Sequence, residues 1–467
     1  MAGGKRRAGG VYLRAPGEKR RPPPEAAAVF HLDEPGVAGV PLHHNLDRLP
    51  TPEGAAGDAV RSFLLAALGV WAADKFLPRA DTSDGWTRSI TLDLPVAPAF
   101  APLLPLLARL LRGMTGDHWT LYGREGAPAI PAAAPTPWRD AWQPEAVALF
   151  SGGLDSLIGA IDLLEGGRRL LLVGHHDYGQ LAGLQQSLAG ALAAHYGAGR
   201  VRLLSLRAQF PQTRELTLRS RSLLFLALGL AAAVAWGPAI PLFIPENGWI
   251  SLNPPLTGNR LGALSTRTTH PTLLAALTAI WREAGLSTPL SNPYRGLTKG
   301  EMAASCRNAS LLKRLAPATL SCARPVASRW QRQAAGHCGY CYPCLMRRAA
   351  LHVLGLDMGD HYRTDILTAP HILARRLQGR HLRALLLALL AWQTSPGDLE
   401  ARLWLGDDPE EIPSRLSWAR GLLRAGFAEI DRWLREQSPP WRREGWEQEM
   451  APEPAAHPEN LSPWENS

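Results

Sequence analysis

The segment that decides the fold is Val147–Leu164, VALFSGGLDSLIGAIDLL, which joins an apolar run to a run with helical spacing. The apolar run is typical of a buried parallel strand, and the residues from Leu157 onward are typical of a helix. The two consecutive glycines between them allow positive φ angles and a close approach of the backbone to a ligand. Backbone N–H groups in such a turn, at a helix N-terminus, bind anions. The predicted phosphate-binding loop comprises Ser151, Gly152, Gly153, Leu154, Asp155 and Ser156.

Asp155 is the unusual member of this loop, because its carboxylate would repel a bare phosphate. It therefore predicts either a Mg²⁺ ion between the carboxylate and the phosphates or N-capping of the helix that follows. The loop has no lysine at its end, so it does not match the GxxxxGK[ST] loop of P-loop ATPases.

The surrounding sequence alternates between strands and helices. Strands are expected at 146–150, 170–175, 201–206 and 241–245, and helices at 155–165, 181–196 and 216–236. Such alternation predicts an α/β fold, a parallel sheet with helices on both faces, in which ligands bind beyond the carboxyl ends of the strands.

Composition shifts divide the chain into five predicted segments. They are a disordered basic arm (1–28), a small N-terminal α/β domain (29–143), the core domain (144–372), a helical appendage (373–436) and a disordered tail (437–467).

Composition also limits the class of protein. The hydrophobic content of 46% supports a core, and the net charge of +9 fits an anionic substrate, a nucleotide or nucleic acid, or simply an arginine-rich composition. The start of the chain has no apolar signal-peptide region, and the longest apolar run, Leu223–Trp236, is shorter than a bilayer span. We therefore expect a cytoplasmic protein with no membrane partner.

The cysteines predict a metal centre. Cys338, Cys341 and Cys344 form a C-x₂-C-x₂-C pattern, and Cys322 lies upstream of them. Four thiolates bind Zn²⁺ tetrahedrally in structural sites, with backbone N–H groups donating to the sulfurs. His337 in place of Cys322, or an iron–sulfur cluster, is an alternative.

The loop sequence SGGLDS resembles the SGGxDS motif of the PP-loop ATP pyrophosphatase superfamily. This resemblance implies the adenine nucleotide alpha hydrolase-like (HUP) fold and the cleavage of Mg-ATP to AMP and pyrophosphate.

Further segments resemble the 7-cyano-7-deazaguanine synthase (QueC) family. They are HHDYGQ at 175–180, RSRSLLFL at 219–226, PENG at 245–248, the lysine element at 292–302, and the cysteine pattern with its following arginine. The resemblance implies nucleotide-binding roles for His176, Asp177, Tyr178, Arg219 and Arg221. It implies catalytic roles for Asp155, Lys299 and Arg347, and a zinc that pins the segment bearing Arg347.

The order of these motifs is most similar to the QatC family of bacterial Qat anti-phage cassettes, over roughly residues 80–360. That resemblance implies partner proteins of a defence operon, and an N-terminal unit and C-terminal helices that the plain synthase lacks. The segment 250–271 differs from the corresponding segment of the synthase, which binds substrate and is rich in acidic residues. Its basic residues here suit a 7-carboxy-7-deazaguanine-like carboxylate, a phosphate or a protein terminus. Candidate substrate residues are Glu246, Asn247, Arg260, Arg267 and His270.

Two other functions stay open on the sequence alone. One is a tRNA-modifying adenylating enzyme, which for thiolation would need a reactive cysteine such as Cys306. The other is a nucleotide-binding scaffold of a defence complex without catalysis. We expect Cys306 to be an ordinary core or surface thiol.

Overall fold

The chain is described here in a computed structural model, which covers residues 9–24, 26–50, 52–126, 128–130, 142–215, 217, 219–256, 269–325, 335–403 and 412–441. The chain forms two compact units and enters each more than once. The first unit comprises Met1–Ser151, Gly166–Ile244 and Leu264–Asn292, and the second comprises Gly152–Glu165, Pro245–Ala263 and Pro293–Ser467. The domain boundaries expected from composition stay predictions.

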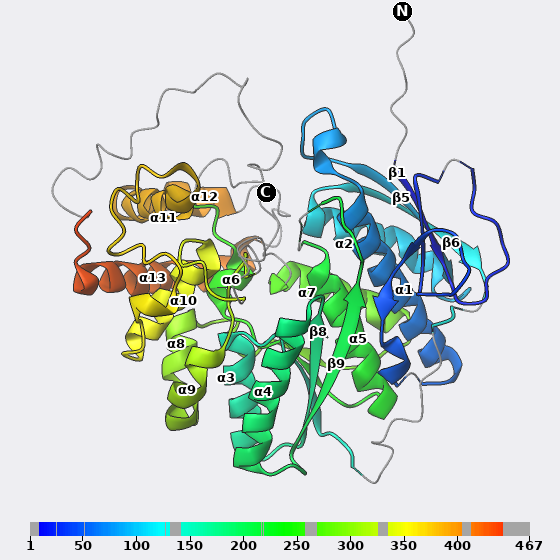
Figure 1. The fold of residues 1–467 in the computed structure, drawn as a ribbon, viewed down its shortest axis with the longest axis horizontal. Helices are drawn as coiled ribbons and strands as arrows, with labels where there is room; N and C mark the ends of the chain where they lie inside the picture. Colours follow the sequence, from blue (N-terminus) through cyan, green and yellow to red (C-terminus); the bar gives the residue numbers. More distant parts are fainter. Residues whose placement is uncertain are drawn as a thin grey trace, which may run out of the picture. The chain divides into compact units, whose positions relative to one another are not determined.

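The first unit contains the sheet that the opening segment predicts (Figure 1). Its order is β11-β10-β7-β8-β9-β4, and all pairs are parallel except β9 with the edge strand β4. From β7 the next parallel strands along the chain, β8 and β9, are added on one side, and the later strands β10 and β11 are added on the other side. The strand order therefore reverses between β7 and β10. The carboxyl ends of strands at such a reversal are where open α/β sheets bind ligands. The strands are β4 (His43–His44), β7 (Ala146–Leu149), β8 (Leu170–His176), β9 (Val201–Gln209), β10 (Leu242–Phe243) and β11 (Leu290–Ser291).

Helices of the same unit flank this sheet. Helix α4 packs on β8 and β9, and α5 packs on β7, β8 and β10. Because Gly229 has no side chain, α5 can approach β7 and β10 closely; a Cβ atom there would lie 2.6 Å from a methyl of Leu149. The expected α/β fold with a parallel sheet is confirmed. The helices of the first unit are α1 (Gly54–Phe76), α2 (Leu104–Thr115), α4 (Gly179–Tyr196), α5 (Arg221–Trp236) and α7 (Pro271–Glu283).

A second parallel sheet lies in the same unit, with the order β3-β2-β1-β5-β6. The predicted disordered arm is wrong for its residues 9–14, because they form the central strand, paired with both β2 and β5. Strand β1 carries three successive buried residues, Val11, Tyr12 and Leu13, and this buried run outweighs the basic residues around it. The strands are β1 (Gly9–Arg14), β2 (Ala28–His31), β3 (Val40–Pro41), β5 (Ser89–Val96) and β6 (His118–Glu125).

Helix α1 is the core helix of the first unit. Among the described residues it is long and apolar enough to cross a membrane, but 78% of its most apolar window is buried inside the protein. It packs on β5 and α5, and a Cβ atom at Gly69 would lie 2.9 Å from the methyl carbons of Leu92. This burial accounts for the helix as part of a hydrophobic core.

The second unit is helical where it is described. Its C-terminal helices share a core that includes Trp249, Leu345, Leu385, Phe427 and Trp433. The range of the predicted helical appendage, 373–436, contains α11, α12 and most of α13, and its status as a separate segment stays a prediction. The tail beyond residue 441 lies outside the described residues. The helices are α3 (Leu154–Glu165), α6 (Gly248–Leu252), α8 (Lys299–Ala304), α9 (Ala309–Leu315), α10 (Tyr342–Val353), α11 (Arg376–Thr394), α12 (Pro396–Leu403) and α13 (Ile412–Gln437).

Candidate functional site

The predicted phosphate-binding loop leaves the carboxyl end of β7 and runs straight into α3. Gly152 has a φ of +82°, in the region that favours glycine, as the turn predicted. The helix begins at Leu154, one residue before the expected range of 155–165, and the Leu157 N–H donates to the Gly153 carbonyl at 3.1 Å. The Ser156 hydroxyl donates to the same carbonyl at 2.9 Å. Asp155 therefore lies in the first turn of α3, not at its N-cap.

Asp155 joins two residues that are distant in sequence. Its carboxylate accepts a hydrogen bond from the Lys299 ammonium group, with which it forms an ion pair. The side-chain amide of Asn247 donates to the same carboxylate at 2.7 Å, and the Asn247 backbone N–H does so at 3.3 Å. The side chains of Lys299 and Asp155 are 9% and 13% exposed, so this charged pair is largely withdrawn from water. We call Asp155, Asn247 and Lys299 the Asp155 group.

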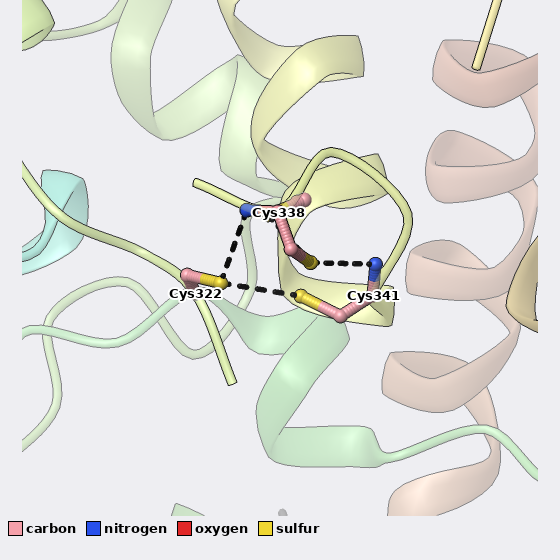
Figure 2. Close-up of side chains that lie close together, drawn as sticks. Cys322, Cys338 and Cys341 are labelled. Atoms are coloured by element: carbon pink, nitrogen blue, oxygen red, sulfur yellow. Dashed lines mark hydrogen bonds between the residues drawn. The ribbon is translucent and has the colours of Figure 1, made fainter. Parts of the chain in front are cut away.

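The four predicted cysteines come together in a cluster that could hold a metal ion, and Figure 2 shows three of them, Cys322, Cys338 and Cys341. Their sulfur atoms all lie within 4.8 Å of one another. The Cys322–Cys341 and Cys338–Cys344 pairs are separated by 3.8 and 3.9 Å between sulfurs. Thiolates around one tetrahedral Zn²⁺ at a Zn–S distance of about 2.3 Å lie roughly 3.8 Å apart, so the cluster fits zinc. The expected backbone donors are present: the N–H groups of Ala323, Arg324, Cys338 and Cys341 reach cluster sulfurs at 3.3–3.5 Å.

The chemistry of the thiols also favours a cation. The neighbouring Cys322 thiol raises the pKa of Cys341 and of Cys344, while it lowers the pKa of Cys338. Four thiolates held this close together would repel one another, and a bound metal ion would neutralise them. His337 does not replace Cys322, since its Nε2 atom accepts a hydrogen bond from the Ser321 N–H at 3.1 Å. Burial lowers the pKa of His337 to about 3, in keeping with a neutral imidazole that accepts this bond.

The metal centre is tied to the start of α3 by the residues before Cys322. The Ser321 hydroxyl accepts a hydrogen bond from the Leu154 N–H at 3.2 Å. The Leu320 N–H donates to the Gly152 carbonyl at 2.9 Å. A metal bound by Cys322 would therefore fix the segment that holds the phosphate-binding loop.

Arg347 lies in α10, three residues after Cys344, and is 2% exposed. It donates to the Thr319 hydroxyl at 2.6 Å and to the Ala316 carbonyl at 2.8 Å. Burial lowers the pKa of Arg347. These contacts hold the segment 316–319 that leads to Ser321; a direct role on pyrophosphate stays a prediction.

The predicted nucleotide residues at the end of β8 and directly after it lie in the first unit. His176 is partly buried, which lowers its pKa, and its Nδ1 lies 3.1 Å from the Ser205 hydroxyl. The Oδ1 atom of Asp177 is buried without a hydrogen-bond partner among the described residues. Tyr178 precedes α4 as its N-cap residue. Arg221, the first residue of α5, donates to Nδ1 of the fully buried His175 at 3.3 Å.

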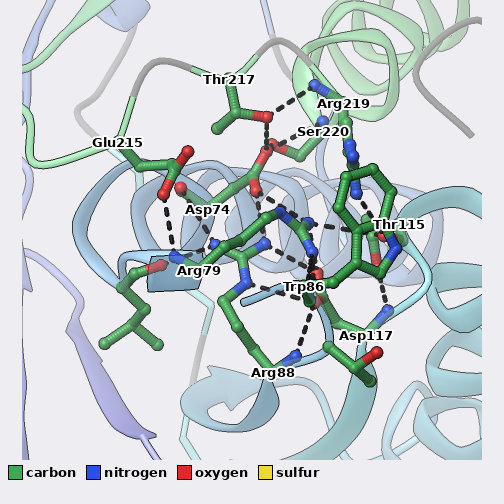
Figure 3. A network of polar contacts seen from close by, with 12 residues as sticks. Asp74, Arg79, Trp86, Arg88, Thr115, Asp117, Glu215, Thr217, Arg219 and Ser220 are labelled. Carbon is green, nitrogen blue, oxygen red and sulfur yellow. Dashed lines mark hydrogen bonds and ion pairs between the residues drawn. The ribbon is translucent and has the colours of Figure 1, made fainter. Parts of the chain in front are cut away.

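Arg219 belongs to a buried polar network of the first unit (Figure 3). Its guanidinium group lies 4.1 Å from the Trp86 ring centroid and donates to the Thr115 carbonyl at 3.1 Å. Burial and the neighbouring Arg79 lower its pKa to about 10. The network pairs Arg79 and Arg88 with Asp117, at 2.8 and 2.7 Å. Sequence reasoning placed Arg219 at a nucleotide, and the structure gives it these protein contacts; its nucleotide role stays a prediction.

The candidate substrate residues are spread over both units. Asn247 is fully buried, Glu246 before it is half-buried, and His270 is buried beside the N-terminus of α7 in the first unit. Arg260 and Arg267 lie outside the described residues.

The chain is similar in sequence to a curated protein. The chain is 30% identical over 256 residues to the 7-cyano-7-deazaguanine synthase of Novosphingobium aromaticivorans, and the match covers 50% of this chain and 99% of that protein. The chain belongs to the 7-cyano-7-deazaguanine synthase family. No family model matches it, and no solved structure matches it.

For this member of the 7-cyano-7-deazaguanine synthase family, sequence reasoning predicted the loop, the lysine and the four cysteines. The structure brings the cysteines together and pairs Lys299 with Asp155, while the roles of these residues stay predictions. Sequence reasoning assigned Asn247 to a substrate and missed its contact with Asp155. It also missed Ser321, which directly precedes a metal ligand, and this position is a usable signal.

Proposed function

We propose that this chain is an ATP-dependent adenylating enzyme that acts on a 7-deazaguanine-type carboxylate and releases AMP and pyrophosphate. The observation that carries the proposal is the Asp155 group. A lysine and an amide from distant segments meet a carboxylate in the first helical turn after a Ser-Gly-Gly loop. Membership of the synthase family supports the chemistry.

In the proposed reaction, an oxygen of the substrate carboxylate attacks the α-phosphorus of ATP. The bond between the α-phosphorus and its bridging oxygen breaks, and pyrophosphate leaves with that oxygen. The N-terminus of α3 and the Lys299 ammonium group stabilise the negative charge that develops on the leaving group. An amine then attacks the acyl adenylate, and AMP leaves.

Asp155 supplies an oxygen ligand of the kind that Mg²⁺ takes beside substrate phosphates, so the loop fits that ion. Bound there, Mg²⁺ would neutralise phosphate charge. Asn247 orients the Asp155 carboxylate through two hydrogen bonds and leaves the ion pair with Lys299 in place.

His176, Asp177 and Tyr178 of the first unit are proposed to contact a hydrogen-bond donor such as an adenine amino group. The buried Oδ1 atom of Asp177 supports this, because it lacks a partner among the described residues and an adenine amino group is a hydrogen-bond donor.

The chain's chemistry disfavours the thiolation alternative. Cys306 is 6% exposed, and burial raises its pKa to about 12. A persulfide carrier needs an accessible thiolate of low pKa. Adenylation followed by attack of an amine requires no such cysteine.

The wider setting is proposed from the resemblance to QatC, with a role in bacterial anti-phage defence in the cytoplasm. The attacking amine would then be either ammonia or the terminus of a partner protein. Intact mass spectrometry of the co-expressed pair tests the second possibility. An ATP-dependent mass gain on the partner is expected, and an unchanged partner mass would overturn protein conjugation.

The experiment for the proposed function gives the purified chain Mg-ATP with and without 7-carboxy-7-deazaguanine and follows pyrophosphate release. Release that depends on the carboxylate is expected, and Asp155→Asn should abolish it. The matched control is Asp58→Asn, a half-buried aspartate of α1 that pairs with Arg61. Nucleotide binding without pyrophosphate release would favour a scaffold instead.

A further inference from the structure

Glu429 is a buried carboxylate on α13, far in sequence from the Asp155 group. It is 8% exposed and accepts hydrogen bonds from the Thr298 hydroxyl and from the Gly300 N–H, the latter at 3.1 and 3.2 Å. Burial raises the pKa of Glu429. A buried carboxylate is costly unless it is hydrogen-bonded, so these two donors explain why an acid is tolerated at this position.

The two residues that Glu429 contacts flank Lys299 in the chain. Thr298 is the N-cap of α8 and forms a capping box with Glu301, so the turn has a defined geometry. At Gly300 a Cβ atom would lie 2.6 Å from a carboxylate oxygen of Glu429, and only glycine permits this approach. Glu429 therefore stabilises the turn in which Lys299 lies and from which it contacts Asp155.

Helix α13 also contacts the short helix that Asn247, another member of the Asp155 group, caps. A Cβ atom at Gly426 would lie 2.1 Å from the Trp249 ring, and the Phe427 ring packs on Trp249 with centroids 5.1 Å apart. Trp249 is in α6, the short helix capped by Asn247. Its indole N–H donates to the Tyr342 hydroxyl of α10 at 2.6 Å, which fixes the ring.

We propose that α13 is a positioning element of the Asp155 group, in which Glu429 holds Lys299 through its flanking residues and Gly426 and Phe427 hold Asn247 through Trp249. Glu429 is a positioning residue and not a catalytic one, because its contacts are to the turn and not to the reacting groups. The inference rests on the proposed function for its catalytic consequence, but the positioning itself is measurable without a substrate.

The first test measures the reactivity of Lys299 towards an amine-acylating reagent, followed site by site with mass spectrometry. Lys299 is 8% exposed and paired with Asp155, so it is acylated slowly in the wild-type chain. In Glu429→Ala the turn loses two acceptor contacts, and we expect acylation of Lys299 to rise about tenfold. Exposed Lys313 is the fast reference, and buried Lys75 of the first unit reports global unfolding.

Two further variants make the comparison specific. Glu429→Gln keeps one acceptor oxygen, so its Lys299 should react faster than in the wild type and slower than in Glu429→Ala; it carries the test alone if the alanine variant does not fold. Glu436→Ala removes an acid of the same helix whose side chain is 58% exposed, and it should leave Lys299 as slow as in the wild type. Equal Lys299 reactivity in the Glu429 and Glu436 variants would overturn the proposal.

The second test measures pyrophosphate release by the same variants. Glu429→Ala should lower kcat about tenfold and change the KM for ATP less, since Lys299 acts on the leaving group. If the wild type releases no pyrophosphate, the proposed function fails while the acylation result still decides the positioning. If the wild type is active and Glu429→Ala keeps its kcat, the positioning role is wrong.

Discussion

Asp155 and Lys299 meet across 144 residues of sequence, and their ion pair is the residue-scale basis of the account. The loop around Asp155 could be predicted because its signal lies within a short stretch of sequence: two glycines, with a strand before them and a helix after them. The pairing with Lys299 could not be derived from spacing, since it depends on how the chain folds back. The resemblance to a family named Lys299, but only the structure gives it Asp155 as a partner.

Replacing Lys299 tests this pair. Lys299→Ala should lower pyrophosphate release by about 100-fold or more, the usual effect of removing a donor that stabilises transition-state charge. Initial rates of release measure it, with Lys313→Ala, an exposed lysine, as the control. Comparable rates in the two variants would remove Lys299 from the mechanism.

Replacing Cys306, unlike replacing Lys299, should leave activity unchanged. The Cys306 pKa of about 12 leaves only about one ten-thousandth of the thiol ionised at pH 8. Iodoacetamide should therefore modify Cys306 slowly in the native chain, and Cys306→Ser should keep full pyrophosphate release. Loss of activity in this variant with a native thermal unfolding curve would reopen the thiolation mechanism.

At the scale of elements, the strands around the loop could be predicted because buried parallel strands read as short apolar runs between turns. Strand β1 was missed because basic and glycine residues surround it, and its place between β2 and β5 depends on partners distant in sequence. Helix α1 was missed within a region of mixed composition, although its apolar run is long.

The buried ion-pair network of the first unit predicts a stability effect. Asp117→Asn would remove a carboxylate that pairs with both Arg79 and Arg88. The side chains of these arginines are only 8% and 3% exposed. The free energy of unfolding should fall by about 3–5 kcal/mol, as measured by denaturant unfolding. The exposed variant Asp81→Asn is the control, with a change within about 0.5 kcal/mol expected.

The same residue gives a pH dependence. Burial would raise the pKa of Asp117, but hydrogen bonds and charge from Arg88 outweigh burial and hold this pKa below its ordinary value. The unfolded chain therefore takes up a proton first as the pH falls. The stabilisation by Asp117 is present above about pH 4 and is lost as the pH drops through the folded pKa. A wild type and an Asp117→Asn variant that lose stability in parallel below pH 4 would contradict this.

The metal centre predicts a second effect at this scale. The purified chain should hold about one zinc ion, and Cys344→Ser should lose it and unfold at a lower temperature. Elemental analysis and thermal unfolding measure this. Cys306→Ser, which removes a cysteine outside the cluster, should keep the zinc. Iron in place of zinc, or a Cys344→Ser variant that retains its metal, would refute the assignment.

At the scale of the whole molecule, the chain enters each of its two units more than once, and linear segments could not predict this. Composition divides a sequence into consecutive stretches, whereas the helix that follows β7 and the segment that follows β10 both belong to the second unit. The match to the synthase covers 50% of this chain and 99% of that protein, so the other half of this chain has no counterpart in that relative.

The central claim is that the loop and Lys299 serve the transfer of adenylate and not of the terminal phosphate. The most direct measurement identifies the nucleotide product when the chain turns over Mg-ATP with 7-carboxy-7-deazaguanine. The account predicts AMP and pyrophosphate in equal amounts. ADP and inorganic phosphate as the products would contradict it.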